Sequence, residues 1–329
     1  MPARTRNWAL GCGVIILVVV AVFVAVFHVY GPVATGATMA KPIYLIKPSP
    51  KKYGTDAVNI MESVALYAES PEFDVAKERA LDQIRTAESY EDTYEPLNDL
   101  AKVAGGKHSS FRPPKGGAEA DDSSGGTDAV SVAAKGGIAI AKVPGIARED
   151  DGQNYANVVT KGVLDNARCG AIVDLRGNDG GDMGPMIAGL SPLLPDGELL
   201  WFVSRSGTSA VTVNGNAAKG GGSPLSTQGG KREVPVAVLV DGETASSGEA
   251  TMLAFRGLDY SRSFGQPTAG YSSANITIDM YDGATLVMTM AKDRARTGEE
   301  YSEEPIIPDE ETDSAEEAAM AWLAQQGCS

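Results

Sequence analysis

The pattern of hydrophobic and polar residues divides the chain into a continuous apolar run near its start, a region with helical periodicity, and a longer region of alternating strand-like and helix-like segments. The apolar run, residues 8–27, contains no charged residue. It matches the length of about 20 residues that crosses a bilayer, so we expect a membrane anchor in residues 1–30. Because Arg4 and Arg6 precede the run, the positive-inside rule predicts a cytoplasmic N-terminus and an exterior remainder. A cleaved signal peptide is the alternative.

Apolar positions three and four residues apart occur throughout residues 58–94 and predict two amphipathic helices, which Pro71 separates. A third, shorter helix follows and ends at the glycine pair 105–106, a common helix stop. We therefore expect a small helical domain in residues 55–107, which a stalk of residues 31–54 joins to the anchor.

From residue 108 to the C-terminus, short β-branched runs alternate with helical ones. The expected strands are 129–133, 137–143, 170–177, 199–205, 234–240 and two within 276–295, and the expected helices are 155–167, 185–194, 249–257 and 314–327. This alternation predicts an α/β (mixed α+β) core over residues 108–329. Two glycine-rich polar stretches, near 113–128 and 214–232, predict flexible inserts in that core.

Composition and charge narrow the classes of partner. With 329 residues, of which 43% are hydrophobic, the chain can bury a sizeable core. A net charge of −15 argues against a nucleic-acid partner, which requires a basic surface, and would attract cationic ligands. The three cysteines show no metal-ligand spacing, and we expect neither a metal nor a cofactor. Cys12 lies in the apolar run, whereas Cys169 and Cys328 either pair in an oxidising exterior or remain free thiols.

Two polar segments follow apolar, strand-like runs. The stretch "DGETASSGEA", residues 241–250, lies between a strand and a helix, so one of its serines could be an ordinary helix N-cap. The same junction also presents backbone N–H groups and the positive end of a helix dipole to a ligand. In "DLRGNDGG", residues 174–181, the last two glycines allow bare backbone to approach a carbonyl group, although an ordinary glycine-rich loop would look the same.

A base for serine chemistry is also present. The chain has two histidines, His28 at the edge of the apolar run and His108 on a short loop beside Ser109 and Ser110. A lone histidine is often structural. However, a serine hydroxyl becomes a good nucleophile when a base takes its proton, and histidine is the natural base near neutral pH.

Four motifs, in this order along the chain, resemble those of the carboxy-terminal processing (tail-specific) serine peptidases: "DLRGNDGG", "TASSGEA", "SFGQPTAG" and "PIIPDE". The resemblance runs from about Val58 to the C-terminus. In that family the nucleophile is the serine three residues before the motif glutamate, so the resemblance implies Ser246. It also implies an oxyanion hole built from the backbone N–H of Ser247 and from Gly180 or Gly181.

Two departures from the better-known members point to one branch of the family. The lysine of the Ser-Lys dyad is replaced by Tyr271, and a phenol, which ionises at about pH 10 in model peptides, is a poor base at neutral pH. No PDZ segment fits between Phe111 and Asp150. Both departures are similar to the Ser-His branch typified by the nisin resistance protein, which is membrane-anchored and has a helical N-terminal region and a "GGKHS"-like motif. The resemblance to this branch implies that His108 is the base.

With nucleophile, base and oxyanion donors all assigned, we expect a hydrolase in which Ser246 attacks a peptide carbonyl and His108 transfers the proton. The residue that orients His108 is left open among Glu249, Asp309 and Ser109. The resemblance implies a peptide or protein substrate cut near its C-terminus, for instance a cationic antimicrobial peptide (lantibiotic resistance). Two alternatives remain: a peptide-binding or immunity protein that does not cut, and a general envelope protease that trims many C-termini.

Overall fold

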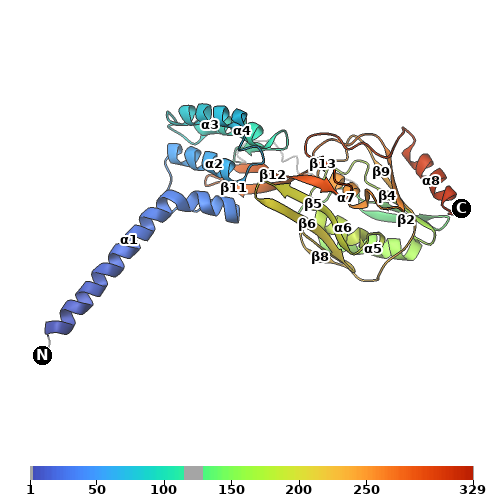
Figure 1. Ribbon diagram of the computed structural model, residues 1–329, viewed down its shortest axis with the longest axis horizontal. Coiled ribbons are helices and arrows are strands. Elements are labelled where there is room, and N and C mark those ends of the chain that lie inside the picture. Colours follow the sequence, from blue (N-terminus) through green and yellow to red (C-terminus); the bar gives the residue numbers. More distant parts are fainter. Residues whose placement is uncertain (1–2, 115–128, 329) are drawn as a thin grey trace. The chain divides into compact units, whose positions relative to one another are not determined.

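The computed structural model describes residues 3–114 and 129–328, and these residues form two compact units (Figure 1). The first unit contains residues up to 114 together with residues 275–289, and the second contains residues 129–274 and 290–328. The chain therefore leaves the first unit, returns to it for one short segment, and ends in the second. The mixed α/β class expected from the sequence is confirmed.

The first helix, α1 (Ala3–Met39), contains the apolar run. Within the described residues, its segment Leu17–Met39 is long and apolar enough to cross a membrane, with a mean hydropathy of 2.3. The helix is bent (Figure 1), and Pro32 inside it accounts for the bend, because proline removes one backbone hydrogen bond and its ring clashes with the preceding turn. Beyond the bend, Gly36 packs closely on Ile60, so the expected stalk is helical in its first part and packs against the unit.

Three further helices and a short 3-10 turn form most of the first unit, as the periodicity predicts. They are α2 (Pro50–Val64), α3 (Pro71–Ile84), η1 (Glu91–Thr93) and α4 (Tyr94–Gly105). Ser49 and Ser70 cap α2 and α3, since their hydroxyls accept from the N–H groups of Lys52 and Phe73, and a proline follows each cap.

A hairpin from late in the chain completes this unit. The strands involved are β1 (Ser110–Arg112), β11 (Ser273–Asp279) and β12 (Thr285–Ala295). β12 pairs with β11, and its first residues pair antiparallel with β1. Ile278, Leu286 and Met288 are buried among the helices, and this burial places residues 275–289 in the first unit. The division therefore differs from the single boundary at residue 107 that the sequence suggested.

The second unit is built on a six-stranded sheet in the order β14-β10-β9-β4-β3-β2. Its strands are β2 (Ser131–Lys135), β3 (Ile138–Lys142), β4 (Gly170–Asp174), β9 (Val236–Val240), β10 (Ser261–Gly265) and β14 (Glu310–Glu311). All neighbours are parallel except β2 and β3. Every residue of β4 and β9 is buried, which is typical of parallel strands covered on both faces.

Helices cover both faces of this sheet. They are α5 (Gly152–Asn166), α6 (Met183–Leu190) with the 3-10 turn η2 (Ser191–Leu193), α7 (Ser247–Phe255) and α8 (Ala315–Gln325). One core cluster joins Ala171 and Val173 of β4 to α5, α6 and α7. Ile172, whose side chain alternates to the other face, packs with Ala319 and Leu323 of α8.

Antiparallel strands add a second layer to this unit, and two short ones lie within the second expected insert. They are β5 (Gly197–Ser204), β6 (Gly207–Asn214), β7 (Ala217–Lys219), β8 (Leu225–Ser226) and β13 (Glu300–Tyr301). β7 pairs with β6 and with β8, so residues 214–232 are not the flexible insert expected. Gly220 shows why a glycine-rich segment can be ordered. Its φ is +91°, and a Cβ there would lie 2.1 Å from the Ala210 carbonyl oxygen, so glycine is needed at this position for close packing. The first expected insert lies, from residue 115 on, outside the described residues.

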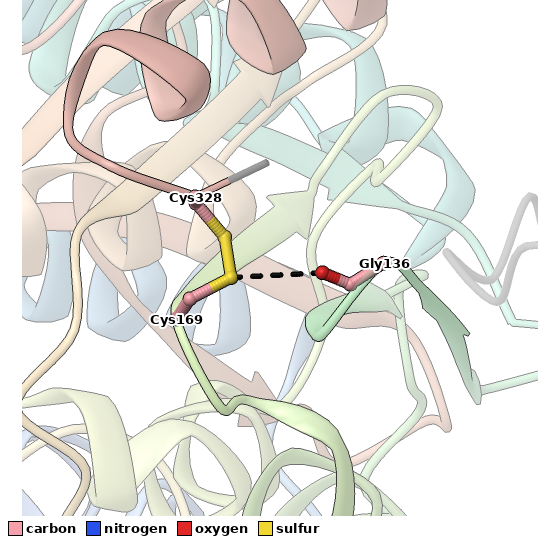
Figure 2. The surroundings of a disulfide bond; sticks show 3 residues. All are labelled: Gly136, Cys169 and Cys328. Atoms are coloured by element: carbon pink, nitrogen blue, oxygen red, sulfur yellow. Dashed lines mark hydrogen bonds between the residues drawn. A yellow bond between two sulfur atoms is a disulfide. The ribbon is translucent and has the colours of Figure 1, made fainter.

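A disulfide joins Cys169, directly before β4, to Cys328, after α8, with 5.2 Å between the two Cα atoms (Figure 2). The pairing decides between the two alternatives that the sequence left open for these cysteines. The bond spans 159 residues and fixes the end of α8 against the sheet. A disulfide of this kind belongs in an oxidising compartment.

We expect replacement of both cysteines, Cys169→Ser with Cys328→Ser, to lower the free energy of unfolding by roughly 2–5 kcal/mol, because the bond restricts the unfolded chain over a long loop. Urea unfolding followed by tryptophan fluorescence measures the change, since Trp322 on α8 reports on this region. Reductant should lower the unfolding midpoint of the parent protein but not that of the double variant. Equal unfolding midpoints for the parent protein, the parent protein with reductant and the double variant would contradict the prediction. The variant Cys12→Ser, which leaves the disulfide intact, is the control.

Candidate active site

Two strand ends meet at one edge of the six-stranded sheet, because β4 and β9 are parallel neighbours. The loop after β4 carries the "DLRGNDGG" motif and the loop after β9 carries "TASSGEA". Backbone and side-chain bonds tie the two loops together: the N–H of Ala245 donates to the Asn178 carbonyl oxygen at 2.8 Å, and Thr244 Oγ1 donates to the Leu175 carbonyl oxygen at 2.9 Å. Folding thus brings together the two motifs that carry the candidate nucleophile and the candidate oxyanion donors.

Ser246 lies in this junction with φ +51° and ψ −116°, at the start of α7. Among the described residues other than glycine, it shares a positive φ only with Ala40. Ser246 and Glu249 form a capping box at the start of α7, but an ordinary N-cap residue adopts the β region, so capping alone does not account for these angles. Strained backbone of this kind costs on the order of 1–3 kcal/mol and is found at functional sites, including the strand–turn–helix elbows that expose a nucleophile.

The buried carboxylate of Glu249 holds this strained turn in place. Its Oε2 accepts from the N–H groups of Ser246 at 2.8 Å and Tyr271 at 2.7 Å, and its Oε1 accepts from the Gly270 N–H at 2.9 Å and from the Thr268 hydroxyl. Burial raises the pKa of Glu249, while these four hydrogen bonds act in the opposite direction. Glu249 therefore anchors the candidate nucleophile to the segment that contains Tyr271.

The other two residues considered for orienting His108 also have local partners. Asp309 Oδ2 accepts from both the N–H and the hydroxyl of Ser263, at 2.8 and 2.7 Å, which joins β10 to the segment before β14. The hydroxyl of Ser109 accepts from the N–H of Thr289 at 2.9 Å within the first unit. Each of these contacts is sufficient to give the residue a structural role.

The glycine loop lies directly against Ser246. A Cβ on Gly180 would lie 2.9 Å from the Cβ of Ser246 and 3.3 Å from the backbone nitrogen of Ser247, and the φ of Gly180 is +109°, so glycine is required there. The N–H of Gly180, however, donates to Asn178 Oδ1 at 2.9 Å. In the described part of the chain, no acceptor faces the N–H of Gly181 or of Ser247. These two groups are thus available to bind an oxyanion.

The side chains of Ser247 and Asn178 hold the loops that carry these two N–H groups. The Ser247 hydroxyl donates to the Gly181 carbonyl oxygen at 2.7 Å, which links the residues that carry the two N–H groups. Asn178 is fully buried, and its Nδ2 donates to the Val143 carbonyl oxygen at 2.7 Å while its Oδ1 binds Gly180. Asn178 was not among the residues predicted from the sequence, although its place inside the glycine motif was a signal for it.

His108 lies in the first unit, on the loop between α4 and β1 that begins at Gly106. Burial, together with the nearby positive charges of Lys107 and Arg112, lowers the pKa of its imidazole to about 4. His108 is therefore neutral at pH 7, which is the form that can accept a proton. Ser246, Ser247, Gly180 and Gly181 all belong to the second unit.

A second buried acid, which the sequence analysis did not identify, lies on β12 in the second unit. Asp293 Oδ2 accepts from the Ser272 hydroxyl at 3.0 Å, and Oδ1 has no hydrogen-bond partner among the described residues. Burial raises the pKa of Asp293 to about 8, and the negative charge of Glu249 contributes in the same direction. Asp293 therefore carries a proton at neutral pH. Asp293 lies outside the recognised motifs. In the sequence it is one of several polar residues that alternate with apolar ones along an expected strand.

The described residues contain no group of three histidine, cysteine or acidic side chains that could hold a metal ion.

Residues 137–312 match the model of peptidase family S41. The chain is also 38% identical over 291 residues to the nisin-resistance protein of Lactococcus lactis subsp. lactis, a match that covers 86% of this chain and 90% of that protein. The chain belongs to peptidase family S41. The resemblance inferred from the motifs is thereby confirmed, and this S41 member is a serine peptidase.

Two solved structures share the fold of this chain. A lipoprotein from Streptococcus agalactiae superposes with a TM-score of 0.73 at 27% identity, over 86% of this chain and 99% of that one. The photosystem II D1 C-terminal processing protease superposes with a TM-score of 0.60 over 81% of this chain and 94% of that one. At 13% identity, this second similarity shows a shared fold.

We expect Asp293→Asn to change how the stability of this S41 peptidase depends on pH. An ordinary aspartate loses its proton at about pH 4, whereas Asp293 in the folded protein holds it to about pH 8. Between these values the folded state binds more protons than the unfolded state, so the contribution of Asp293 to stability is present below pH 4 and is lost as the pH rises to 8.

The isosteric asparagine cannot titrate, so Asp293→Asn should gain stability relative to the parent protein between pH 5 and pH 8, as measured by urea unfolding. Glu243→Gln, an exposed acid in the loop after β9, is the control and should leave the pH dependence unchanged. Parallel stability curves for Asp293→Asn and the parent protein would show that the buried acid does not hold its proton.

Proposed function

We propose that this S41 member is a membrane-anchored extracellular peptidase that cuts peptides or proteins near their C-termini, with Ser246 as nucleophile and His108 as general base. The observation that carries the proposal is the strained Ser246 turn, which lies beside two backbone N–H groups, those of Gly181 and Ser247, that have no acceptor in the described structure. A nucleophile next to preorganised oxyanion donors is the arrangement that acyl transfer requires.

In the proposed reaction, His108 takes the proton of the Ser246 hydroxyl as Oγ attacks the carbonyl carbon of the scissile bond. The N–H groups of Gly181 and Ser247 bind the oxyanion, and each such donor contributes about 10²- to 10³-fold in rate. The imidazolium then donates its proton to the leaving amine, the C–N bond breaks, and an ester on Ser246 remains. Water, activated by His108, attacks this ester, and the second proton transfer releases the acid and restores the serine.

The choice of base follows from the chemistry of the other candidate. Tyr271 occupies the place of the lysine in the Ser-Lys branch, and a phenol, which ionises at about pH 10 in model peptides, is a poor base at neutral pH. A neutral imidazole contributes about 10²- to 10⁴-fold as a general base. We therefore assign the base to His108, which the structure keeps neutral at physiological pH.

Two features support an exterior location for the peptidase part. The segment Leu17–Met39 is apolar enough to span a bilayer, and Arg4 and Arg6 precede the apolar run, which favours a cytoplasmic N-terminus. The disulfide between Cys169 and Cys328 in the second unit is typical of proteins in an oxidising compartment.

For the substrate we propose a cationic antimicrobial peptide, which cleavage inactivates. The net charge of −15 favours the approach of cationic peptides. The similarity to a nisin-resistance protein over most of both chains supports the same choice.

We expect Ser246→Ala and His108→Ala each to abolish cleavage of such a peptide, because each removes an atom that takes part in bond making or proton transfer. Ser247→Ala should lose much less, since its N–H remains and only the hydroxyl bond to Gly181 is removed. Mass spectrometry of nisin incubated with the full-length protein in detergent measures fragment formation, and urea unfolding checks that each variant is folded.

Undiminished cleavage by purified Ser246→Ala or His108→Ala would refute the corresponding assignment. A stable complex between the parent protein and the peptide without fragments would instead favour a peptide-binding immunity protein. Fragments from most members of a mixed peptide pool would favour a general envelope protease.

The acidic limb of kcat/KM should fall near pH 4 rather than at about pH 6.5, the ordinary value for histidine, because His108 must be neutral to act as base. Lys107→Gln removes a positive charge that disfavours the imidazolium, so the limb should move to higher pH in that variant. Initial rates across the acidic range test both statements. A parent limb at the ordinary histidine value would contradict the environment described for His108.

A further inference from the structure

A short segment directly after α1 exposes several large apolar side chains. Ile43 is 41% exposed, Leu45 50% and Ile46 63%, and Tyr281 of the adjoining hairpin is 45% exposed. Apolar side chains that are grouped on a surface, rather than scattered singly, mark a place where another apolar phase or partner binds.

The charge of this segment is opposite to that of the whole chain. Residues 41–52, "KPIYLIKPSPKK", contain four lysines and no acidic residue, whereas the protein carries a net charge of −15. Lys41, Lys47 and Lys51 are exposed, and Lys47 lies 5.7 Å from the centre of the Tyr90 ring. Exposed aliphatic, aromatic and lysine side chains together are characteristic of segments that lie at a membrane–water interface.

The segment is held in a fixed position next to α1. The N–H of Ile43 donates to Thr35 Oγ1 at 2.9 Å, and Thr35 belongs to the part of α1 beyond the bend. Between the exposed residues, the ring of Tyr44 packs edge-on against that of Tyr281 at 5.6 Å. The exposed side chains therefore belong to an ordered surface within the first unit.

The bend of α1 limits the distance between this segment and a membrane that the first part of the helix would span. The helix changes direction along its length (Figure 1), which Pro32 inside it explains, so its last residues do not continue along the axis of its first part. The helical part beyond Pro32 is short, about 10 Å at 1.5 Å per residue. Residues 41–47 thus begin within reach of the lipid headgroups.

We propose that Ile43, Leu45, Ile46, Lys47 and Tyr281, here called the interfacial patch, lie in the headgroup region of an anionic bilayer on the peptidase side. The apolar side chains enter the boundary with the acyl chains, and the lysines contact lipid phosphates. The inference rests on the membrane anchor proposed above and is independent of the Ser246–His108 chemistry. An anionic lipid surface fits the patch better than a second copy of the chain, because the basic residues lie directly after the membrane span.

The interfacial patch would hold the first unit at the surface on which cationic amphipathic peptides gather. A peptidase fixed there meets its substrate at the raised concentration that the anionic membrane itself creates. This location gives the lysine-rich segment a role that complements the acidic remainder of the chain.

Full-length protein in vesicles tests the proposal with an environment-sensitive NBD label at Ile46→Cys in a Cys12→Ala background. The matched control is Val75→Cys on α3, which is 61% exposed in the same unit. In phosphatidylcholine vesicles that contain phosphatidylglycerol, we expect the label at position 46 to be quenched by aqueous iodide several-fold less than the label at position 75. The additional substitutions Leu45→Ser and Lys47→Gln should remove most of this protection.

Three outcomes would overturn the inference, and they are distinguishable. Equal quenching at positions 46 and 75, in protein that resists alkaline carbonate extraction, refutes the interfacial patch but leaves the anchor intact. Protein extracted by carbonate refutes the anchor and the patch together. Protection that increases with the protein-to-lipid ratio and does not require phosphatidylglycerol assigns the patch to a second copy of the chain. Peptide cleavage is measured on the same samples. Cleavage that persists in any of these cases shows that the Ser246–His108 chemistry does not depend on the interfacial patch.

Discussion

The buried carboxylate of Glu249 is the interaction on which the proposed site depends. It accepts four hydrogen bonds, from the N–H groups of Ser246, Gly270 and Tyr271 and from the Thr268 hydroxyl. A left-handed backbone at a serine persists only where its surroundings over-determine it, and these bonds supply that constraint. Without them the turn could relax into an ordinary helix cap, and the hydroxyl of Ser246 would no longer be held beside the glycine loop.

The parallel pairing of β4 and β9 gives this constraint its setting. Both strands are buried along their whole length, so their pairing register is fixed by burial on two faces, and the loops at their carboxyl ends must meet. The hydroxyl of Ser247 then fastens one loop to the other at Gly181, while Asn178 holds its own loop through Gly180 and ties it to Val143 after β3. The position of the N–H groups of Gly181 and Ser247 therefore depends on the contact between the two loops, and that contact depends on the pairing of the two buried strands.

Burial also sets the protonation of the two acids and the base described here. It lowers the pKa of His108 and raises those of Glu249 and Asp293, since removal from water disfavours each charged form. Four hydrogen bonds act against this effect at Glu249, whereas the carboxyl group of Asp293 has one partner, on one oxygen.

Local periodicity was enough for the sequence to determine the membrane-length apolar run, the first-unit helices and the strand–helix alternation. The motifs, through their resemblance to a peptidase family, proposed Ser246, His108 and either Gly180 or Gly181 as site residues. What the sequence could not determine depends on residues far apart along the chain. The pairing of Cys169 with Cys328, the return of residues 275–289 to the first unit, the order in the 214–232 segment and the engagement of the Gly180 N–H by Asn178 were decided by tertiary structure. The physical reason is that hydrophobic periodicity reports how a segment meets water, whereas close packing and hydrogen-bond partners are fixed only when distant segments are brought together.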